Sequence, residues 1–400
     1  MYRQFATMHL AKSSNKPLNR DYEPDIEKSE QYSRWFFEFL GVWPMITKNE
    51  TMAKKCVSKF MMVVCFLAMC FPLVPVSLDT FLVQKSIFVR LLRLIGPISA
   101  ALSTLFKYII IIYRSEKIAL CMEHIKSDWM EVGKEKERAI MIKNVKVGRS
   151  LTVSACVIMY SSVMFYFLMK PLIIGSKLNE FNETVRPEVY PGFNLFFDSK
   201  KSPTYEIMFC TLCVSACIRY TVTMAAYNLA TTFVCHACGQ IQIVISRLQC
   251  LFDEIEEGLN HGKLRERFSA IVYCHVRGLR LSTSIDDVLR EICFVEVVSS
   301  TLLICLYEYM IQSGWENSAI LELSTYIFLL CSWIFNVFIF CYIGELLKEQ
   351  YEEVGKSTYL IDWYRLPSKT SLAVIMIIAM ANIPRKITAG PMFDLSMASF

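Results

Sequence analysis

Six long apolar stretches dominate this chain and limit what it can fold into. They are Cys56 to Leu78, Leu94 to Tyr113, Leu151 to Met169, Ile207 to Val234, Ile292 to Ile311 and Ile320 to Ile343. At about 1.5 Å per residue, a helix over any of them crosses the roughly 30 Å hydrocarbon core of a bilayer. Only helices and closed barrels satisfy the backbone in lipid, and strand-like alternation is absent. The sequence therefore predicts six membrane-spanning helices.

Charge is segregated from these stretches. The chain is 54% hydrophobic and 20% charged, yet the six stretches hold only Lys59, Lys107, Arg219, Glu296, Glu308 and Glu322. The net charge of +5 comes without a Lys/Arg run interleaved with aromatic residues, so we expect no nucleic-acid partner. No phosphate-binding loop, HExxH or GxSxG motif is present, and we expect neither an enzyme nor a cofactor.

Basic residues favour a cytoplasmic N-terminal segment, residues 1–55. Lys54, Lys55 and Lys59 stand at the start of the first apolar stretch, whereas Asp79 follows its far end. An excess of Lys and Arg marks the cytoplasmic side of a membrane protein. Whole-loop counts of Lys and Arg lean the same way without deciding the orientation.

Two glycosylation sequons give opposing signals about orientation. Asn182 begins Asn-Glu-Thr in the third connection, which we expect outside, and Asn182 is the candidate glycosylation site. Asn49 begins the same tripeptide in the supposed cytoplasmic segment. The two sequons nearly cancel as evidence.

Several helices are predicted outside the membrane. Apolar residues recur at helical spacing from Ile241 to Ile255 and again from Leu264 to Val288, so helices should project from the fourth and fifth spans. Residues 32–40 indicate a short amphipathic helix that either lies at the membrane interface or packs on the protein itself. Leu372 to Ala381 is apolar but too short to span.

The 16 cysteines do not suggest a disulfide framework or a metal site. The connections expected outside, residues 79–93, 170–206 and 312–319, contain none, so no disulfide can join them. Cys210, Cys213 and Cys217 share a helical face, and Cys235 and Cys238 follow. Cysteine is also a common small apolar residue in membrane helices, and we expect no metal here.

Four charged residues lie deep in the predicted spans: Lys107, Arg219, Glu296 and Glu308. Charges at such depth face the bundle interior or water, which makes these residues candidates for ion or gating interactions. Glu296 and Glu308 are twelve residues apart and cannot form an acid and base pair across one turn. A purely structural role is the more common explanation for such residues.

A family resemblance is carried by the C-terminal region. Phe340-Cys341-Tyr342-Ile343-Gly344 is followed by Tyr359, Trp363 and Pro367, and then by Pro384, Ala389-Gly390, Phe393, Leu395 and Phe400. This pattern resembles that of the insect odorant receptors. The rest of the chain is similar in length, span order and the lack of outer-loop cysteines.

The resemblance implies an all-α membrane helix bundle with six full spans and an incomplete seventh. Residues 56–343 would hold the spans, residues 344–386 a cytoplasmic anchor region with a short helix, and residues 387–400 the start of a truncated pore helix. It implies a tuning subunit that forms a heterotetrameric, odorant-gated cation channel with a shared co-receptor, in the plasma membrane of olfactory sensory dendrites. Volatile odorants and membrane lipid would be its other partners.

The resemblance also implies site residues. Candidates for odorant binding in the outer halves of the spans are Ser99, Leu102, Phe165, Tyr166, Phe209, Cys213, Tyr307 and Tyr326. Candidates for subunit anchoring and entry of the pore helix are Tyr359, Trp363, Pro384, Gly390 and Phe393.

Other classes remain as alternatives. Gustatory receptors share the topology implied here, and their distinguishing residues fall beyond Phe400. A G-protein-coupled receptor is disfavoured because no Asp/Glu-Arg-Tyr follows the third span and no Asn-Pro-x-x-Tyr occurs near the end. A transporter would show repeated halves and interrupted helices, and the sequence has neither.

Overall fold

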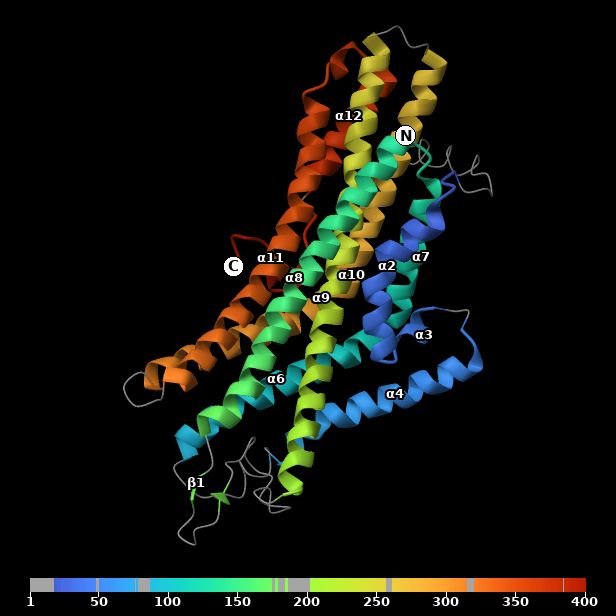
Figure 1. Cartoon of the computed structure of the whole chain (residues 1–400). Helices are drawn as coiled ribbons and strands as arrows, with labels where there is room; N and C mark the ends of the chain where they lie inside the picture. The colour runs from blue at the N-terminus through green and yellow to red at the C-terminus, as the bar shows by residue number, and fades with distance from the viewer. Residues whose placement is uncertain are drawn as a thin grey trace.

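The computed structural model is an elongated bundle in which most of the long helices run along its length (Figure 1). It describes residues 18–47, 50–75, 77, 87–174, 177–178, 184–185, 202–256, 261–314, 320–383 and 385–400. The candidate residues Asn182 and Pro384 lie outside these ranges.

The helices and strands follow the order expected from the apolar pattern. The helices are α2 (Tyr22–Phe39), α3 (Trp43–Ile46), α4 (Met52–Cys70), α6 (Ile87–Tyr113), α7 (Ser115–Glu131), α8 (Glu135–Ile174), α9 (Thr204–Glu256), α10 (His261–Gly314), α11 (Ile320–Tyr359), η2 (Trp363–Arg365) and α12 (Ser368–Ala381). Two antiparallel pairs of very short strands complete them: β1 (Lys177–Leu178) with β2 (Thr184–Val185), and β3 (Thr388–Ala389) with β4 (Phe393–Asp394). The predicted all-α class is confirmed.

Five helices in the described part of the chain are long and apolar enough to cross a membrane. These spans are Met52–Pro75, Ile95–Tyr113, Glu135–Phe167, Thr204–Ile255 and Leu323–Tyr359. The stretch Ile292 to Ile311, whose apolar composition predicts a sixth span, forms the second half of α10, and α10 is not among the five. The multi-pass membrane fold is therefore confirmed, whereas the count of six stays a prediction.

Helix α9 is the centre of the bundle. It packs against α2, α4, α6, α8, α10 and α11. Its middle turns, including Val222, Ala226, Leu229 and Phe233, are fully buried. A helix that is apolar all round can be covered by other helices or by lipid, and the middle of α9 is covered by its neighbouring helices.

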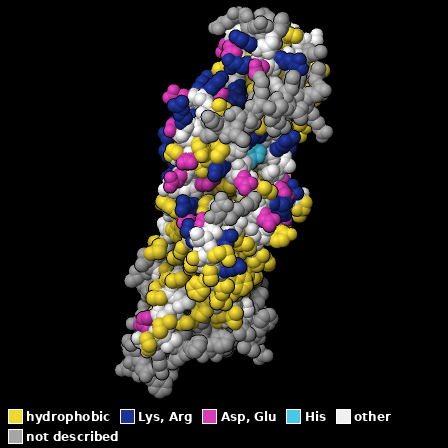
Figure 2. Space-filling model, turned by 90° about the vertical axis from the view of Figure 1, so that its right-hand side faces the viewer, with side chains coloured by type: hydrophobic (Ala, Val, Ile, Leu, Met, Phe, Trp, Pro, Cys, Tyr) yellow, Lys and Arg dark blue, Asp and Glu magenta, His cyan; other side chains and the backbone are white. Residues whose placement is uncertain are grey.

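The bundle has two halves of different surface character. Figure 2 shows mostly hydrophobic side chains on the lower part of the visible face and a concentration of Lys, Arg, Asp and Glu above it. We call these the apolar half, which contains β1, and the polar half, which contains α12 (Figure 1). The predicted extensions of the fourth and fifth spans are present, because α9 continues to Glu256 and α10 begins at His261.

Helix α2 is the amphipathic helix expected near the start of the chain. Its inner face carries Phe37, which is fully buried, and leads to the equally buried Leu40. Its outer face exposes Trp35 (57%) and Phe39 (47%). One face therefore packs on the protein itself, while the other presents aromatic rings of the kind found at membrane interfaces.

The C-terminal residues differ from the expectation of a helix beginning at residue 387. In the described residues 385–400, β3 and β4 form a tight hairpin instead. Gly390 adopts a positive φ of 65°, and its N–H donates to the Arg290 carbonyl of α10 over 3.1 Å. An added Cβ at Gly344 in α11 would collide with the Leu395 carbonyl, so only glycine permits this approach. The segment folds back on α10 and α11, where the Arg290 carbonyl and the Asp286 carboxylate of α10 and the Glu345 carboxylate of α11 accept from its backbone N–H groups.

Candidate functional site

A buried ion pair lies in the middle of the bundle. Lys107 of α6 and Glu296 of α10 approach to 2.6 Å, and their side chains are 0% and 1% exposed. Of the four deep charges noted in the sequence, these two are brought together. Arg219 is half-buried on α9, and Glu308 is exposed on α10.

Polar side chains from two further helices complete this cluster. Lys107 Nζ also donates to Thr223 Oγ1 of α9 at 3.0 Å, and Ser300 Oγ donates to Glu296 Oε1 at 3.2 Å. Asn336 Nδ2 of α11 donates to the same carboxylate oxygen. Four helices therefore meet at one charged, hydrogen-bonded centre, which we call the Lys107 cluster. Its full set of partners is what makes two desolvated charges tolerable here.

Sequence reasoning found the two charges of this cluster but missed their pairing and their neutral partners. The sequence contains one weak indication of the neutral partners. Each of them is a polar residue inside an apolar stretch: Thr223, Ser300 and Asn336. Only the side-by-side placement of α6, α9, α10 and α11 shows that they converge. Lys107 and Glu296 are 189 residues apart in the sequence.

A cluster of aromatic side chains lies between α8 and α9 in the apolar half. Tyr166 contacts Phe167 edge to face at 5.5 Å between ring centroids, and Phe167 contacts Phe209 in the same way at 6.0 Å. Cys213 packs on the same group, around the buried core of Phe167 and Leu212. Three residues predicted to bind the odorant, Tyr166, Phe209 and Cys213, are therefore neighbours.

The other predicted ligand residues form separate contacts. The ring centroids of Tyr307 in α10 and Tyr326 in α11 are 6.4 Å apart. Phe165 stacks on Phe328 with 5.1 Å between the ring centroids. Two candidates lie on α6. Ser99 Oγ donates to the carbonyl of Gly96 at 2.9 Å, and Leu102 is 39% exposed.

The predicted anchor residues lie on or near the polar half. Tyr359 ends α11 and is 66% exposed, Trp363 is half-buried in η2, and Phe393 is 47% exposed in β4. Gly390 is buried against α10 and the ring of Phe294. Helix α12 buries Val374 and Ile377 but exposes Leu372 (49%). This arrangement leaves apolar side chains on the outer surface of the polar half.

A second buried charged group lies where α7, α9 and α10 meet in the polar half. Asp128 is 3% exposed, and its carboxylate accepts from His236 Nε2 at 2.8 Å and from Arg277 Nε. Arg277 also donates to Glu131 at 2.8 Å. Desolvation would raise the pKa of Asp128, but His236 and Arg277 outweigh it and hold that pKa below its ordinary value. We call this group the Asp128 cluster.

Acid should weaken the polar half through its buried histidines. Burial of the 2%-exposed His275 lowers its pKa from 6.5 to about 4, with a smaller contribution from the charge of Arg385. Between these values the unfolded chain binds a proton that the folded chain does not, so stability falls as pH falls. Lowering the pH from 6.5 to 5 should cost at most about 2 kcal/mol through this residue.

The measurement is the unfolding midpoint of the purified protein as a function of pH. His275→Gln should flatten the decline below pH 6.5. Burial also lowers the pKa of His124, so His124→Gln should remove a further part. A decline of the same steepness in both variants would contradict this explanation.

All 16 cysteines are free thiols, and all of them lie in helices.

Comparison with known proteins gives consistent matches. Residues 88–400 match the family model described as 7tm odorant receptor. Odorant receptor 10 of Aedes albopictus is 23% identical over 267 residues, which are 66% of this chain and 64% of that receptor. Odorant receptor 82a of Drosophila melanogaster is 24% identical over 237 residues, or 59% of each chain. The chain thus spans a little under two thirds of the length of these relatives.

Solved structures match in fold. The insect olfactory receptor OR5 from Machilis hrabei superposes with a TM-score of 0.72 at 16% identity, covering 94% of each chain. The structure of the same receptor in complex with eugenol gives a TM-score of 0.73 at the same identity and coverage.

Proposed function

Because this chain belongs to the odorant receptor family of insects, we propose that it is a ligand-binding subunit of an odorant-gated cation channel, formed with the shared co-receptor. The observation that carries the proposal is the family match over residues 88–400. The fold shared with OR5 of Machilis hrabei, which has been solved in complex with eugenol, supports a small volatile molecule as the ligand.

We place the ligand in the apolar half, among the aromatic side chains of α8 to α11. The group around Tyr166, Phe209 and Cys213 and the pair Tyr307 and Tyr326 supply apolar surface with few polar groups. Such surface binds a volatile molecule by burial and shape, and Tyr hydroxyls add a polar contact. Binding favours the open channel to the extent that the ligand prefers that state.

Subunit contact is assigned to the polar half. Tyr359, Leu360 (81% exposed), Tyr364 (65%) and Leu372 present apolar surface around η2 and α12. Contiguous exposed apolar residues of this kind mark protein interfaces. In this arrangement the N-terminus and the polar half face the cytoplasm, and the chain lies in the plasma membrane of the sensory dendrite.

The test is electrical recording from cells that express this chain together with the co-receptor. A panel of volatile molecules that includes eugenol is applied, and currents are compared with those of the co-receptor alone. Tyr326→Ala should raise the half-maximal concentration of an active odorant about fivefold, because it removes a ring whose contact contributes roughly 1 kcal/mol.

Tyr113→Ala is the matched control, since Tyr113 is 79% exposed at the end of α6. Its half-maximal concentration should stay within about twofold of the wild type. Absence of odorant-evoked current at normal surface expression would refute the proposed receptor function. Normal sensitivity of Tyr326→Ala would refute only the placement of the ligand.

A further inference from the structure

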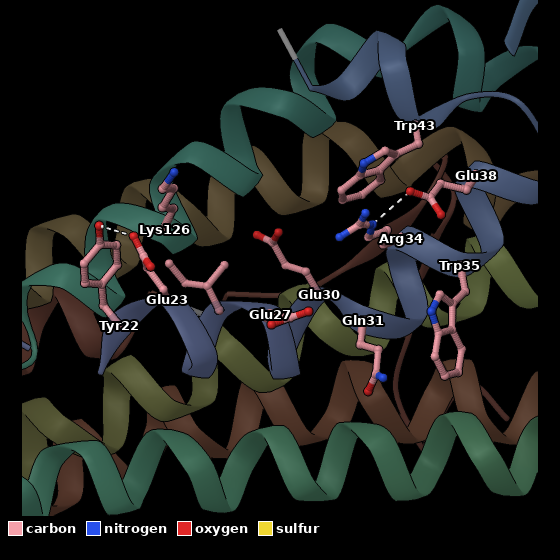
Figure 3. A pocket seen from close by; sticks show the side chains of 11 residues that line it. Tyr22, Glu23, Glu27, Glu30, Gln31, Arg34, Trp35, Glu38, Trp43 and Lys126 are labelled. Carbon is pink, nitrogen blue, oxygen red and sulfur yellow. Dashed lines mark hydrogen bonds and ion pairs between the residues drawn. The ribbon is translucent and has the colours of Figure 1, made fainter. Parts of the chain in front are cut away.

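Helices α2, α3 and α7 line an open cavity of about 500 Å³ that is separate from the aromatic groups and both buried charge clusters. One side of α2 supplies most of its walls, and Trp43 of α3 and Lys126 of α7 close it (Figure 3). It stands next to the first span, which begins at Met52, nine residues after Trp43. The cavity therefore lies where the polar half meets the membrane.

The charge of this cavity is negative but mixed. Its lining includes Glu23, Glu27, Glu30 and Glu38 and two cations, Arg34 and Lys126. Arg34 Nε donates to Glu38 Oε1 at 2.8 Å, so these two charges largely neutralise each other (Figure 3). Three carboxylates are then opposed by Lys126 alone. The carboxylates of the cavity attract a cation, whereas an anion can bind only at the end where a cationic side chain lies.

Two polar groups of the cavity have no partner in the described part of the chain. Trp43 is only 7% exposed, yet its indole N–H donates no hydrogen bond there. Among the described residues, the indole nitrogen of Trp129 is fully buried without a partner, whereas that of Trp43 is not, so Trp43 can still donate to a molecule in the cavity. Glu30 has no ion pair or hydrogen bond within those residues either, and burial raises its pKa to about 7 although the charge of Lys126 opposes this. The cavity thus offers one unused donor and one unused, partly desolvated carboxylate.

Aromatic rings complete the lining. Tyr22, Trp35 and Trp43 all border the cavity, and the faces of such rings attract organic cations. Figure 3 shows Trp43 and Arg34 at one end and the Glu30 carboxylate rising from α2 toward the middle. A donor and a guanidinium therefore stand at one end, and carboxylates occupy the centre.

We propose that this cavity binds the headgroup of a zwitterionic phospholipid. The ammonium lies against Glu30 in the middle of the cavity, and the phosphate oxygens accept from the Trp43 N–H beside Arg34. The acyl chains continue along α4, whose outward residues Val57 (62%) and Phe60 (67%) are exposed and apolar. This order matches a lipid that enters from the membrane side, since its phosphate is nearer to the acyl chains than its ammonium is.

The experiment is native mass spectrometry of the full chain released from detergent that contains phosphatidylcholine or phosphatidylglycerol at increasing concentration. The wild type should retain phosphatidylcholine at about tenfold lower lipid concentration than phosphatidylglycerol, because the three carboxylates repel an anionic headgroup. Free phosphocholine is a third arm. If it displaces the lipid at equimolar concentration, the acyl chains contribute nothing to binding, a soluble ligand replaces the lipid, and the proposal is overturned.

Three variants localise the binding. Glu30→Gln should reduce the preference for phosphatidylcholine to below about threefold, and Trp43→Phe should weaken its retention while keeping the aromatic surface. Glu116→Gln is the control, because Glu116 is exposed on α7 outside the cavity, and it should behave as the wild type. Equal retention of the two lipids by the wild type would overturn the proposal without any variant. A preference that survives both Glu30→Gln and Trp43→Phe would do the same.

Discussion

Replacing Lys107 by Met is expected to lower the free energy of unfolding by about 3–5 kcal/mol, the usual cost of leaving one buried charge without its partner. Glu296 would then lose the ammonium at 2.6 Å and keep only the hydrogen bonds from Ser300 and Asn336. Two neutral donors cannot compensate a carboxylate that is 1% exposed. The protein should reach the membrane in reduced amount, and its thermal unfolding midpoint should fall.

The double variant Lys107→Met with Glu296→Leu separates the charge from the packing. It removes both ions at once, so it should recover most of the stability that Lys107→Met loses. The readouts are the unfolding midpoint and the recovery of monodisperse protein in detergent. Glu308→Gln serves as the control at an exposed position of the same helix and should change the midpoint little. Additive losses in the double variant would contradict direct coupling of the two charges.

Replacing Asp128 by Asn should cost about 3 kcal/mol or more. Its carboxylate is 3% exposed and is shared by His236 and Arg277, so removing its charge leaves Arg277 with Glu131 as its remaining carboxylate. The variant should also alter the pH dependence, because a carboxyl whose folded pKa is depressed stabilises the protein above its unfolded pKa of about 3.8 and loses that effect as pH falls.

Chemical unfolding of the wild type and the variant at pH 7 and near pH 3 measures both effects, because the contribution of Asp128 is complete at pH 7 and is lost only below about pH 3.8. Asp362→Asn is a matched control, since Asp362 lies in the half-buried turn before η2 and outside the cluster. We expect the control to change stability by about 0.5 kcal/mol or less. An Asp128→Asn variant as stable as the wild type would show that His236 and Arg277 find other partners.

The membrane fold could be predicted because lipid leaves a chain few choices. Apolar stretches such as Ile207 to Val234 must be helical where no water can bind the backbone, and α9 covers that stretch completely. The ten apolar residues from Leu372 to Ala381 also became a helix, α12, that does not span. Composition alone did not settle Ile292 to Ile311, where Glu296 and Glu308 interrupt the apolar pattern.

The C-terminal segment could not be predicted from local pattern. Residues 387–400 are apolar enough to suggest the start of a helix, but Gly390 takes a positive φ and bonds to Arg290 of α10. A contact with a residue a hundred positions away in sequence has no local signature. The close approach of Leu395 to Gly344 is of the same kind.

The candidate site shows the same division. Sequence reasoning selected Tyr166, Phe209 and Cys213 by depth, and the fold brings them into one aromatic group. It also selected Ser99 and Leu102, which lie on α6 without a contact to that group among the described interactions. The cavity of α2, α3 and α7 had no signal in the sequence beyond the amphipathic face of α2. Three segments must pack together before their glutamates and indoles surround one space.

The sequence by itself therefore determined whether each segment lies in lipid or in water. The free energy of transferring a segment from water to lipid depends on which apolar and charged residues it contains. The sequence also determined the helices, the spans of clear composition and the depth of Lys107 and Glu296. The tertiary structure alone decided which charges became partners, which aromatic rings became neighbours and where the C-terminal hairpin lies. Those outcomes depend on the rotation and register of packed helices, and a buried charge or donor is stable only where a distant residue happens to complete it.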